Sequence, residues 1–228
     1  MISSIILLYR DALTQTGAAL ARSALMWPLP VVILVLLQLA WVPLGALGII
    51  GGLVHFVLES LLYGAYLYLL GESLSRRTRI KPADLRDAMG RNMREVMSLL
   101  FVIWILQLAL QMASSNGQIS GHVSFVVILA ASVLFNPGPE IICHERSLGG
   151  GMDILVQSFR WVSSNGPEWL INLVLTAAFI IALGSGNVGI LTLIVVGLCL
   201  HPWMLFRGAV YRAIGNTSRR SRDWQSRF

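Results

Sequence analysis

Three residue types that can bind metal ions or carry protons stand side by side in this sequence. They are Cys143, His144 and Glu145, within the stretch EIICHERSLGGG. The His-Glu pair opens like the zinc-protease signature, in which a second histidine four residues after the first turns both imidazoles toward one metal ion. That position is Leu148, so the signature is incomplete and a zinc-protease site is not expected.

A weaker metal alternative joins Cys143 and His144 to Cys199 and His201, which stand near the end of another apolar stretch. Neighbouring residues on a helix point about 100° apart, so Cys143 and His144 are poorly placed to share one ion. Cysteine is also commonly buried for packing alone. We therefore expect no metal and no cofactor.

A second set of ionisable side chains lies inside a long apolar stretch. His55 and Glu59 are four residues apart, so they share one helix face, and Tyr63 and Tyr66 continue the same stripe. Ionisable groups inside a membrane are costly and usually face a bundle interior or a water-filled cavity. The four residues are the candidate intramembrane polar site. It serves either as a proton or ion relay or as a structural hydrogen-bond network between helices.

The elements that must position these residues are membrane helices. Of the 228 residues, 56% are hydrophobic and 12% are charged, with a mean hydropathy of +0.72, whereas a soluble domain carries about 25% charged residues. Uncharged stretches such as 96–139 and 169–206 far exceed the roughly 20 residues that one span needs, and turn residues interrupt them midway. This pattern predicts an all-α integral membrane protein with six transmembrane helices in three hairpins. The expected spans are 28–46, 51–73, 97–113, 122–142, 168–184 and 188–211.

The placement of positive charge predicts the orientation of these spans. All 17 Lys and Arg residues fall in segments on one side of the expected topology, and the three turns on the other side carry none. Positive residues concentrate in cytoplasmic loops of membrane proteins. We therefore expect a multi-pass protein of the bacterial inner (cytoplasmic) membrane, with both termini in the cytoplasm.

Each hairpin follows an expected cytoplasmic amphipathic surface helix. The clearest is PADLRDAMGRNMREVM, and GMDILVQSFRWVSS and the N-terminal 4–26 repeat the theme. RDAL, RDAM and MDIL recur in the three helices, which suggests a unit used three times, although any hairpin protein with such elbow helices would look similar. The chain is expected to be one membrane domain, 1–228. Its parts are 1–74 (interfacial helix and hairpin 1), 75–146 (surface helix and hairpin 2), 147–212 (surface helix and hairpin 3) and 213–228 (basic cytoplasmic tail).

One segment resembles a known group of proteins. The block has Pro139 at a span end, the pair Glu145-Arg146 and the small-residue elbow Gly149–Gly151. An amphipathic helix follows and ends in the motif Ser-x-x-x-Val, from Ser158 to Val162. The block is similar to a recurring block in uncharacterised bacterial multi-pass membrane proteins, which resemble the membrane domain found ahead of some glycerophosphodiester phosphodiesterases. The resemblance covers about a quarter of the chain. It implies six helices with interfacial helices and supplies no catalytic residues.

The residues favour a membrane subunit over an enzyme. The chain has no recognisable nucleophile motif, nucleotide loop or metal-ligand set, so we expect no enzymatic activity. The leading interpretation is a non-catalytic subunit or scaffold of a larger assembly or transport system. Its partners would be anionic lipid head groups on the cytoplasmic side and other membrane or cytoplasmic protein subunits, not nucleic acid. The alternative is the permease subunit of an ABC-type exporter, or a small transporter using His55 and Glu59. The candidate lipid- or partner-docking residues are Arg76, Arg77, Arg79, Lys81, Arg86, Arg91 and Arg94.

Overall fold

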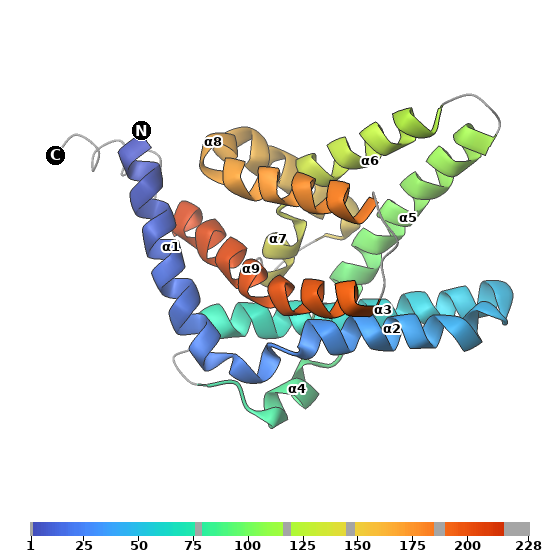
Figure 1. The fold of residues 1–228 in the computed structure, drawn as a ribbon, viewed down its shortest axis with the longest axis horizontal. Coiled ribbons are helices and arrows are strands. Elements are labelled where there is room, and N and C mark those ends of the chain that lie inside the picture. Colours follow the sequence, from blue (N-terminus) through green and yellow to red (C-terminus); the bar gives the residue numbers. More distant parts are fainter. Residues whose placement is uncertain (1, 76–78, 116–119, 145–148, 185–189, 217–228) are drawn as a thin grey trace. The chain divides into compact units, whose positions relative to one another are not determined.

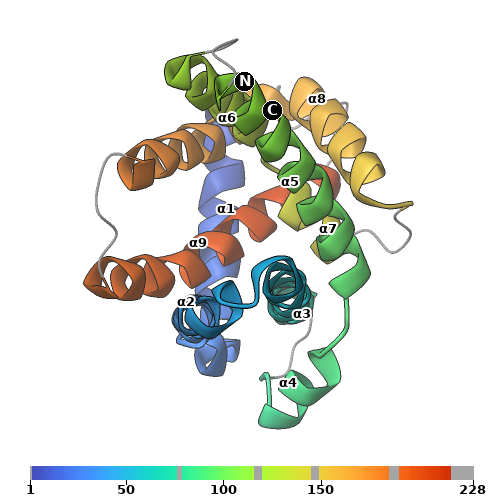
Figure 2. The ribbon, with the colours of Figure 1, turned by 90° about the vertical axis from the view of Figure 1, so that its right-hand side faces the viewer.

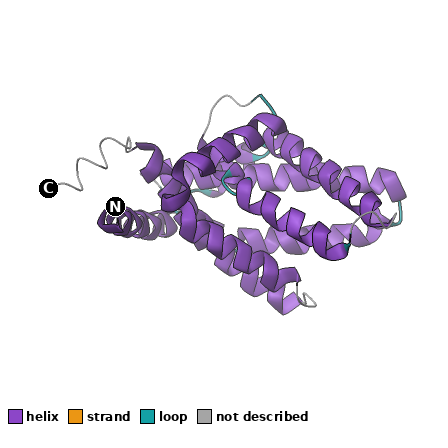
Figure 3. Ribbon diagram, turned by 90° about the horizontal axis from the view of Figure 1, so that it is seen from above, coloured by secondary structure: helices purple, strands orange, loops and turns teal. Residues whose placement is uncertain are grey.

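The computed structural model describes residues 2–75, 79–115, 120–144, 149–184 and 190–216. Regular structure within these ranges is helical, and none of these residues forms a strand (Figure 3). The elements are α1 (Ile2–Arg22), the short 3-10 helix η1 (Ala24–Met26), α2 (Leu29–Gly45), α3 (Gly48–Ser75), α4 (Pro82–Ala88), α5 (Met93–Ser115), α6 (Gly121–Leu134), α7 (Gly138–His144), α8 (Gly151–Gly184) and α9 (Ile190–Asn216).

Five helical segments of the described residues are long and apolar enough to cross a membrane. They are Ala24–Gly45, Gly48–Ser75, Met93–Ser115, Gly121–His144 and Ile194–Asn216. The all-α membrane class is therefore confirmed. The expected span 168–184 forms the second half of α8 and is not one of the five, so the sixth span stays a prediction.

Prolines and local backbone geometry set the helix boundaries. The expected span 122–142 is divided into α6 and α7 by a turn that contains Pro137, because proline lacks the N–H that would continue the ladder. In α8, Asn165 leaves helical geometry (φ −127°, ψ 21°) just before Pro167. This kink separates the 151–164 segment, where a surface helix was expected, from the more apolar remainder.

The second expected surface helix is broken where the sequence predicted continuity. The periodicity of PADLRDAMGRNMREVM predicts one amphipathic helix, but α4 ends at Ala88 and α5 begins at Met93. Gly90 (φ +83°) and Asn92 (φ +54°) both adopt left-handed backbone geometry, which glycine and asparagine tolerate best. The break makes α4 and α5 two separate helices.

The chain divides into two compact units, which are described separately. Unit 1 consists of residues 1–91 and 189–228. Within it α2 and α3 run side by side (Figures 1 and 2), and α9 packs on α1, α2 and α3. A methyl group added at Gly197 of α9 would lie 2.9 Å from Cα of Val31 in α2, so this crossing depends on glycine.

Unit 2 consists of residues 92–188, and α8 packs on α5, α6 and α7 within it. The start of α8 lies against the backbone of α5: a methyl group added at Gly151 would lie 2.6 Å from the carbonyl carbon of Ser98. Because α8 belongs to unit 2 and α9 to unit 1, the third expected hairpin stays a prediction.

Candidate functional site

His55 of the candidate intramembrane site ties α3 to its hairpin partner α2. Its Nε2 lies 3.2 Å from the carbonyl oxygen of Leu37, and because a carbonyl only accepts, this nitrogen carries the proton. The edge-on ring of Trp41 lies 4.9 Å from the imidazole, centroid to centroid. Glu59 and Tyr63 follow on the same helix and are half-buried. His55 thus has a structural role between two helices.

Tyr66, the last residue of that stripe, belongs to a buried network that the sequence did not predict. Its hydroxyl lies 3.2 Å from Nδ1 of His201 in α9, and Nε2 of His201 lies 3.1 Å from Oγ of Ser23. Ser23 donates its own hydrogen to the carbonyl oxygen of Ala19 at 2.8 Å. We call these three side chains the Tyr66–His201–Ser23 network.

The proton positions in this network follow from that last bond. Because Ser23 uses its hydrogen on Ala19, its oxygen accepts from His201, so Nε2 carries the proton. Nδ1 is then the acceptor for the Tyr66 hydroxyl. A neutral imidazole therefore satisfies every bond, and the network joins the C-terminal end of α1 with α3 and α9.

The residues of the weak metal alternative have other surroundings. Both ring nitrogens of His201 are engaged in hydrogen bonds, and Cys199 is exposed. Cys143 and His144 end α7 and are half-buried. Across the described ranges, no group of three or more His, Cys, Asp or Glu side chains is arranged to hold a metal ion. Glu145 and Leu148 lie outside those ranges.

The neighbouring stretch around EIICHERSLGGG forms part of the packing of unit 2. Glu140, Ile141 and Ile142 all belong to α7 and are buried. Gly150 has a φ of +132°, which side-chain-bearing residues rarely adopt. Together with the close approach of Gly151 to α5, this favours an architectural elbow over a catalytic site in the part that the structure describes.

Unit 2 contains its own buried polar network, which the sequence also did not predict. The Trp169 indole N–H donates to Oδ1 of Asn136 at 2.9 Å. The Asn136 amide donates to the Thr176 hydroxyl at 2.7 Å, and that hydroxyl donates to the backbone oxygen of Asn172. The network fixes the segment after α6 against α8. Its one sequence signal is the polar Asn136 that opens NPGPE.

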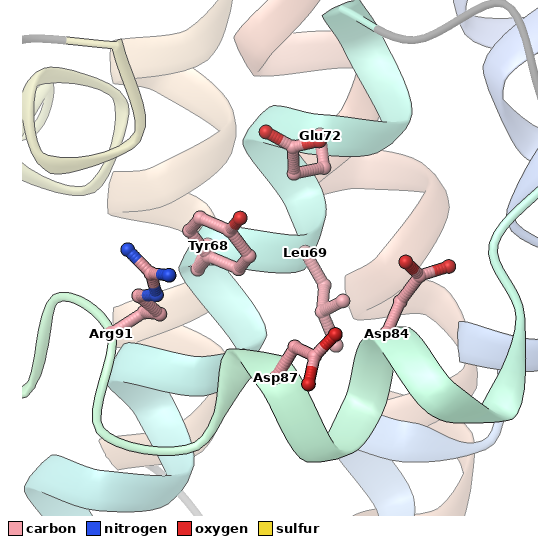
Figure 4. Close-up of a pocket in the computed structure, with 6 residues that line it drawn as sticks. All are labelled: Tyr68, Leu69, Glu72, Asp84, Asp87 and Arg91. Atoms are coloured by element: carbon pink, nitrogen blue, oxygen red, sulfur yellow. The ribbon is translucent and has the colours of Figure 1, made fainter.

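A polar cavity lies where α4 packs against the end of α3, within unit 1. It has a volume of about 320 Å³ and is lined by Tyr68, Leu69, Glu72, Asp84, Asp87 and Arg91. Asp84 and Asp87 rise from α4 toward α3, and Arg91 faces Tyr68 (Figure 4). The guanidinium carbon of Arg91 lies 5.6 Å from the centre of the Tyr68 ring, a cation–π distance. Three carboxylates and one guanidinium make the lining acidic overall.

One of the described basic docking residues, Arg91, lines this cavity. Arg79 and Lys81 are exposed just before α4, and Arg86 is exposed on it. Arg94 is exposed on α5 in unit 2. Arg76 and Arg77 lie outside the described residues. The sequence reasoning missed the three carboxylates, although the Asp84–Asp87 spacing places both on one helix face.

The helices of the protein define its structural class. Its long apolar helices, many with exposed apolar side chains, fit a polytopic membrane protein. Comparisons with protein-family models, curated proteins and solved structures find no match. The resemblance to the membrane domain ahead of glycerophosphodiester phosphodiesterases therefore stays a prediction.

Replacing His55 by alanine is expected to lower the free energy of unfolding by about 1 kcal/mol, because the bond to Leu37 is lost. Glu59→Gln keeps size and shape, so we expect a change within about 0.5 kcal/mol. Thermal unfolding of both purified variants in detergent measures these effects. If Glu59→Gln instead abolishes proton uptake into proteoliposomes while stability is unchanged, the relay interpretation is correct and the structural one is wrong.

Proposed function

We propose that this chain is a non-catalytic membrane subunit that holds a cytoplasmic partner protein at the bacterial inner membrane. The proposal includes six spans in three hairpins with cytoplasmic surface helices, and both termini in the cytoplasm. What supports the orientation is that every Lys and Arg falls on one side of the expected topology. On this orientation α4 and the end of α3 face the cytoplasm.

The single observation that carries the docking proposal is the exposure of Arg79, Lys81 and Arg86 on or just before α4, a short helix that packs against the end of α3. α4 packs on α3, so these charges are presented from a fixed support. Exposed charges on a rigid element steer association and set its register. The cavity between α4 and α3 is lined by the carboxylates of Glu72, Asp84 and Asp87, so the region of α4 offers a partner both signs of charge to match.

A protein partner fits this surface better than lipid alone. A lipid-binding surface needs positive charge only, and the carboxylates of Glu72, Asp84 and Asp87 would repel anionic head groups. A protein surface can carry acidic side chains opposite Arg79, Lys81 and Arg86 and a basic side chain opposite the cavity. The buried networks inside the helices support a subunit over a transporter, since His55, Tyr66 and His201 bond neighbouring helices.

Site-specific photo-cross-linking tests this docking surface. A cross-linker placed at the exposed Met89, next to α4, is expected to capture one protein in native membranes. Changing Arg79, Lys81 and Arg86 to glutamine should reduce that adduct about tenfold or more, because each exposed charge pair contributes up to about 1 kcal/mol. The matched control changes Arg219, Arg220 and Arg222 of the tail to glutamine, which removes the same charge and should leave the adduct unchanged.

Three results would count against the proposal. An adduct equally reduced by the tail variant would show a general charge effect. An adduct with lipid and no protein would assign the surface to anionic head groups. Co-purification of an ATPase that cross-links here would favour the permease subunit of an ABC-type exporter over a scaffold.

A further inference from the structure

A polar stripe runs along α5, one of the most apolar spans of the protein. Gln107, Gln111 and Ser114 recur at helical spacing on one face, where they line a cavity of about 390 Å³ between α5 and α6. Leu110, Ser115, Ser124 and Ile128 complete its lining. Both glutamines are exposed, and neither amide makes a hydrogen bond within the part of the chain that the structure describes.

The depth of these amides makes their exposure significant. At a rise of about 1.5 Å per residue, Gln107 lies about 12 Å and Gln111 about 6 Å from the end of α5 at Ser115. A hydrocarbon core is about 30 Å thick, so Gln107 lies well inside it. Lipid tails offer no hydrogen bonds, and an amide facing them without a partner is unfavourable. A group with matching donors and acceptors is therefore expected to cover this face.

The lining also suits the close approach of another helix. The serines at 114, 115 and 124 are small, and small residues let helix backbones approach in membranes. Glutamine side chains on facing helices hydrogen-bond to each other and promote association there. Small and polar residues at the same place are the usual composition of a helix–helix interface in lipid.

We propose that this face of α5 is a dimer interface that takes the same face of a second copy of the chain. In a parallel dimer with two-fold symmetry, each residue meets its own counterpart at the same depth. A glutamine amide carries both donors and acceptors, so it complements itself. A second copy supplies the required amides at the required depth without a further partner. This inference is independent of the docking surface on α4.

Cysteine cross-linking locates the interface. In a background with Cys143→Ser and Cys199→Ser, Gln107→Cys is expected to form a disulfide-linked dimer when membranes are treated with copper-phenanthroline. Ile105→Cys is the matched control: it is similarly exposed at nearly the same depth, but lies about 160° away around the helix. A cross-link at position 105 as efficient as that at position 107 would overturn the assignment.

The association constant of the chain in liposomes shows how much the two glutamine amides contribute to dimerisation. The full chain is labelled at a C-terminal tag and diluted in a series with increasing amounts of lipid. We expect energy transfer between the labels to show that it dimerises. Changing Gln107 and Gln111 to leucine should lower the association constant about tenfold, about 1.4 kcal/mol. Gln38→Leu removes another exposed glutamine, on α2, and should leave the association constant within about twofold. A wild-type chain that stays monomeric, or a leucine variant that dimerises as well as wild type, contradicts the proposal.

Discussion

Replacing Trp169 by alanine is expected to lower the free energy of unfolding by about 3–5 kcal/mol, the largest effect of any substitution proposed for this protein. The Trp169 side chain is 0% exposed, and its ring stands edge-on to Trp161 at a centroid distance of 4.8 Å. The substitution removes this packing and leaves Oδ1 of Asn136 without its indole donor. Unfolding by SDS titration of the purified protein measures the change.

Two variants separate the contributions of packing and hydrogen bonding. Trp169→Phe keeps most of the ring but removes the N–H, so we expect a loss of about 1–2 kcal/mol. Trp104→Ala changes the same residue type at a position on α5 that is 52% exposed, and its cost should stay below about 1 kcal/mol. Equal losses at positions 169 and 104 would contradict the proposed core of unit 2.

Replacing His201 by alanine is expected to cost about 2–4 kcal/mol, the second-largest effect. The imidazole is 0% exposed and bonds Tyr66 and Ser23 at once. Its removal opens a cavity in the interior of unit 1 and removes one hydrogen bond from each of the two hydroxyl groups. The same SDS titration measures the loss.

A double-mutant cycle shows whether the network acts as a unit. Tyr66→Phe removes only the hydroxyl that donates to Nδ1, and should cost about 1 kcal/mol by itself. In the His201→Ala background the bond to Nδ1 is already gone, so Tyr66→Phe should cost less there than in the wild type. Strictly additive losses would show that the Tyr66–His201 bond contributes nothing to stability.

The membrane class and the helices were predictable because lipid imposes a simple requirement. Every backbone polar group must be satisfied within the spanning segment, which demands long apolar helices. The uncharged stretches of the sequence meet that requirement, and helices occupy them within the described ranges. The break between α4 and α5 was missed because left-handed geometry at Gly90 and Asn92 is a local choice that helical periodicity does not reveal.

The hydrogen-bond partners of the candidate intramembrane residues could not be predicted from the sequence. Spacing along α3 correctly placed His55 and Tyr66 on the same helix, but could not find their partners. Leu37 lies on the preceding helix, and His201 follows Tyr66 by 135 positions. The carboxylates of the α3–α4 cavity were equally invisible, because they meet only when α4 folds back on α3.

The sequence by itself determined that this protein is helical, apolar and suited to a membrane, and its positive charge predicts which side faces the cytoplasm. The tertiary structure decided which helices meet and which polar groups they share. The reason is physical: lipid is as apolar as the helices, so association depends on close fit and hydrogen bonds rather than on hydrophobicity. The close fit depends on individual contacts, such as those of Gly197 with Val31 and of Gly151 with Ser98. These residues are far apart in the sequence, so only folding brings them together.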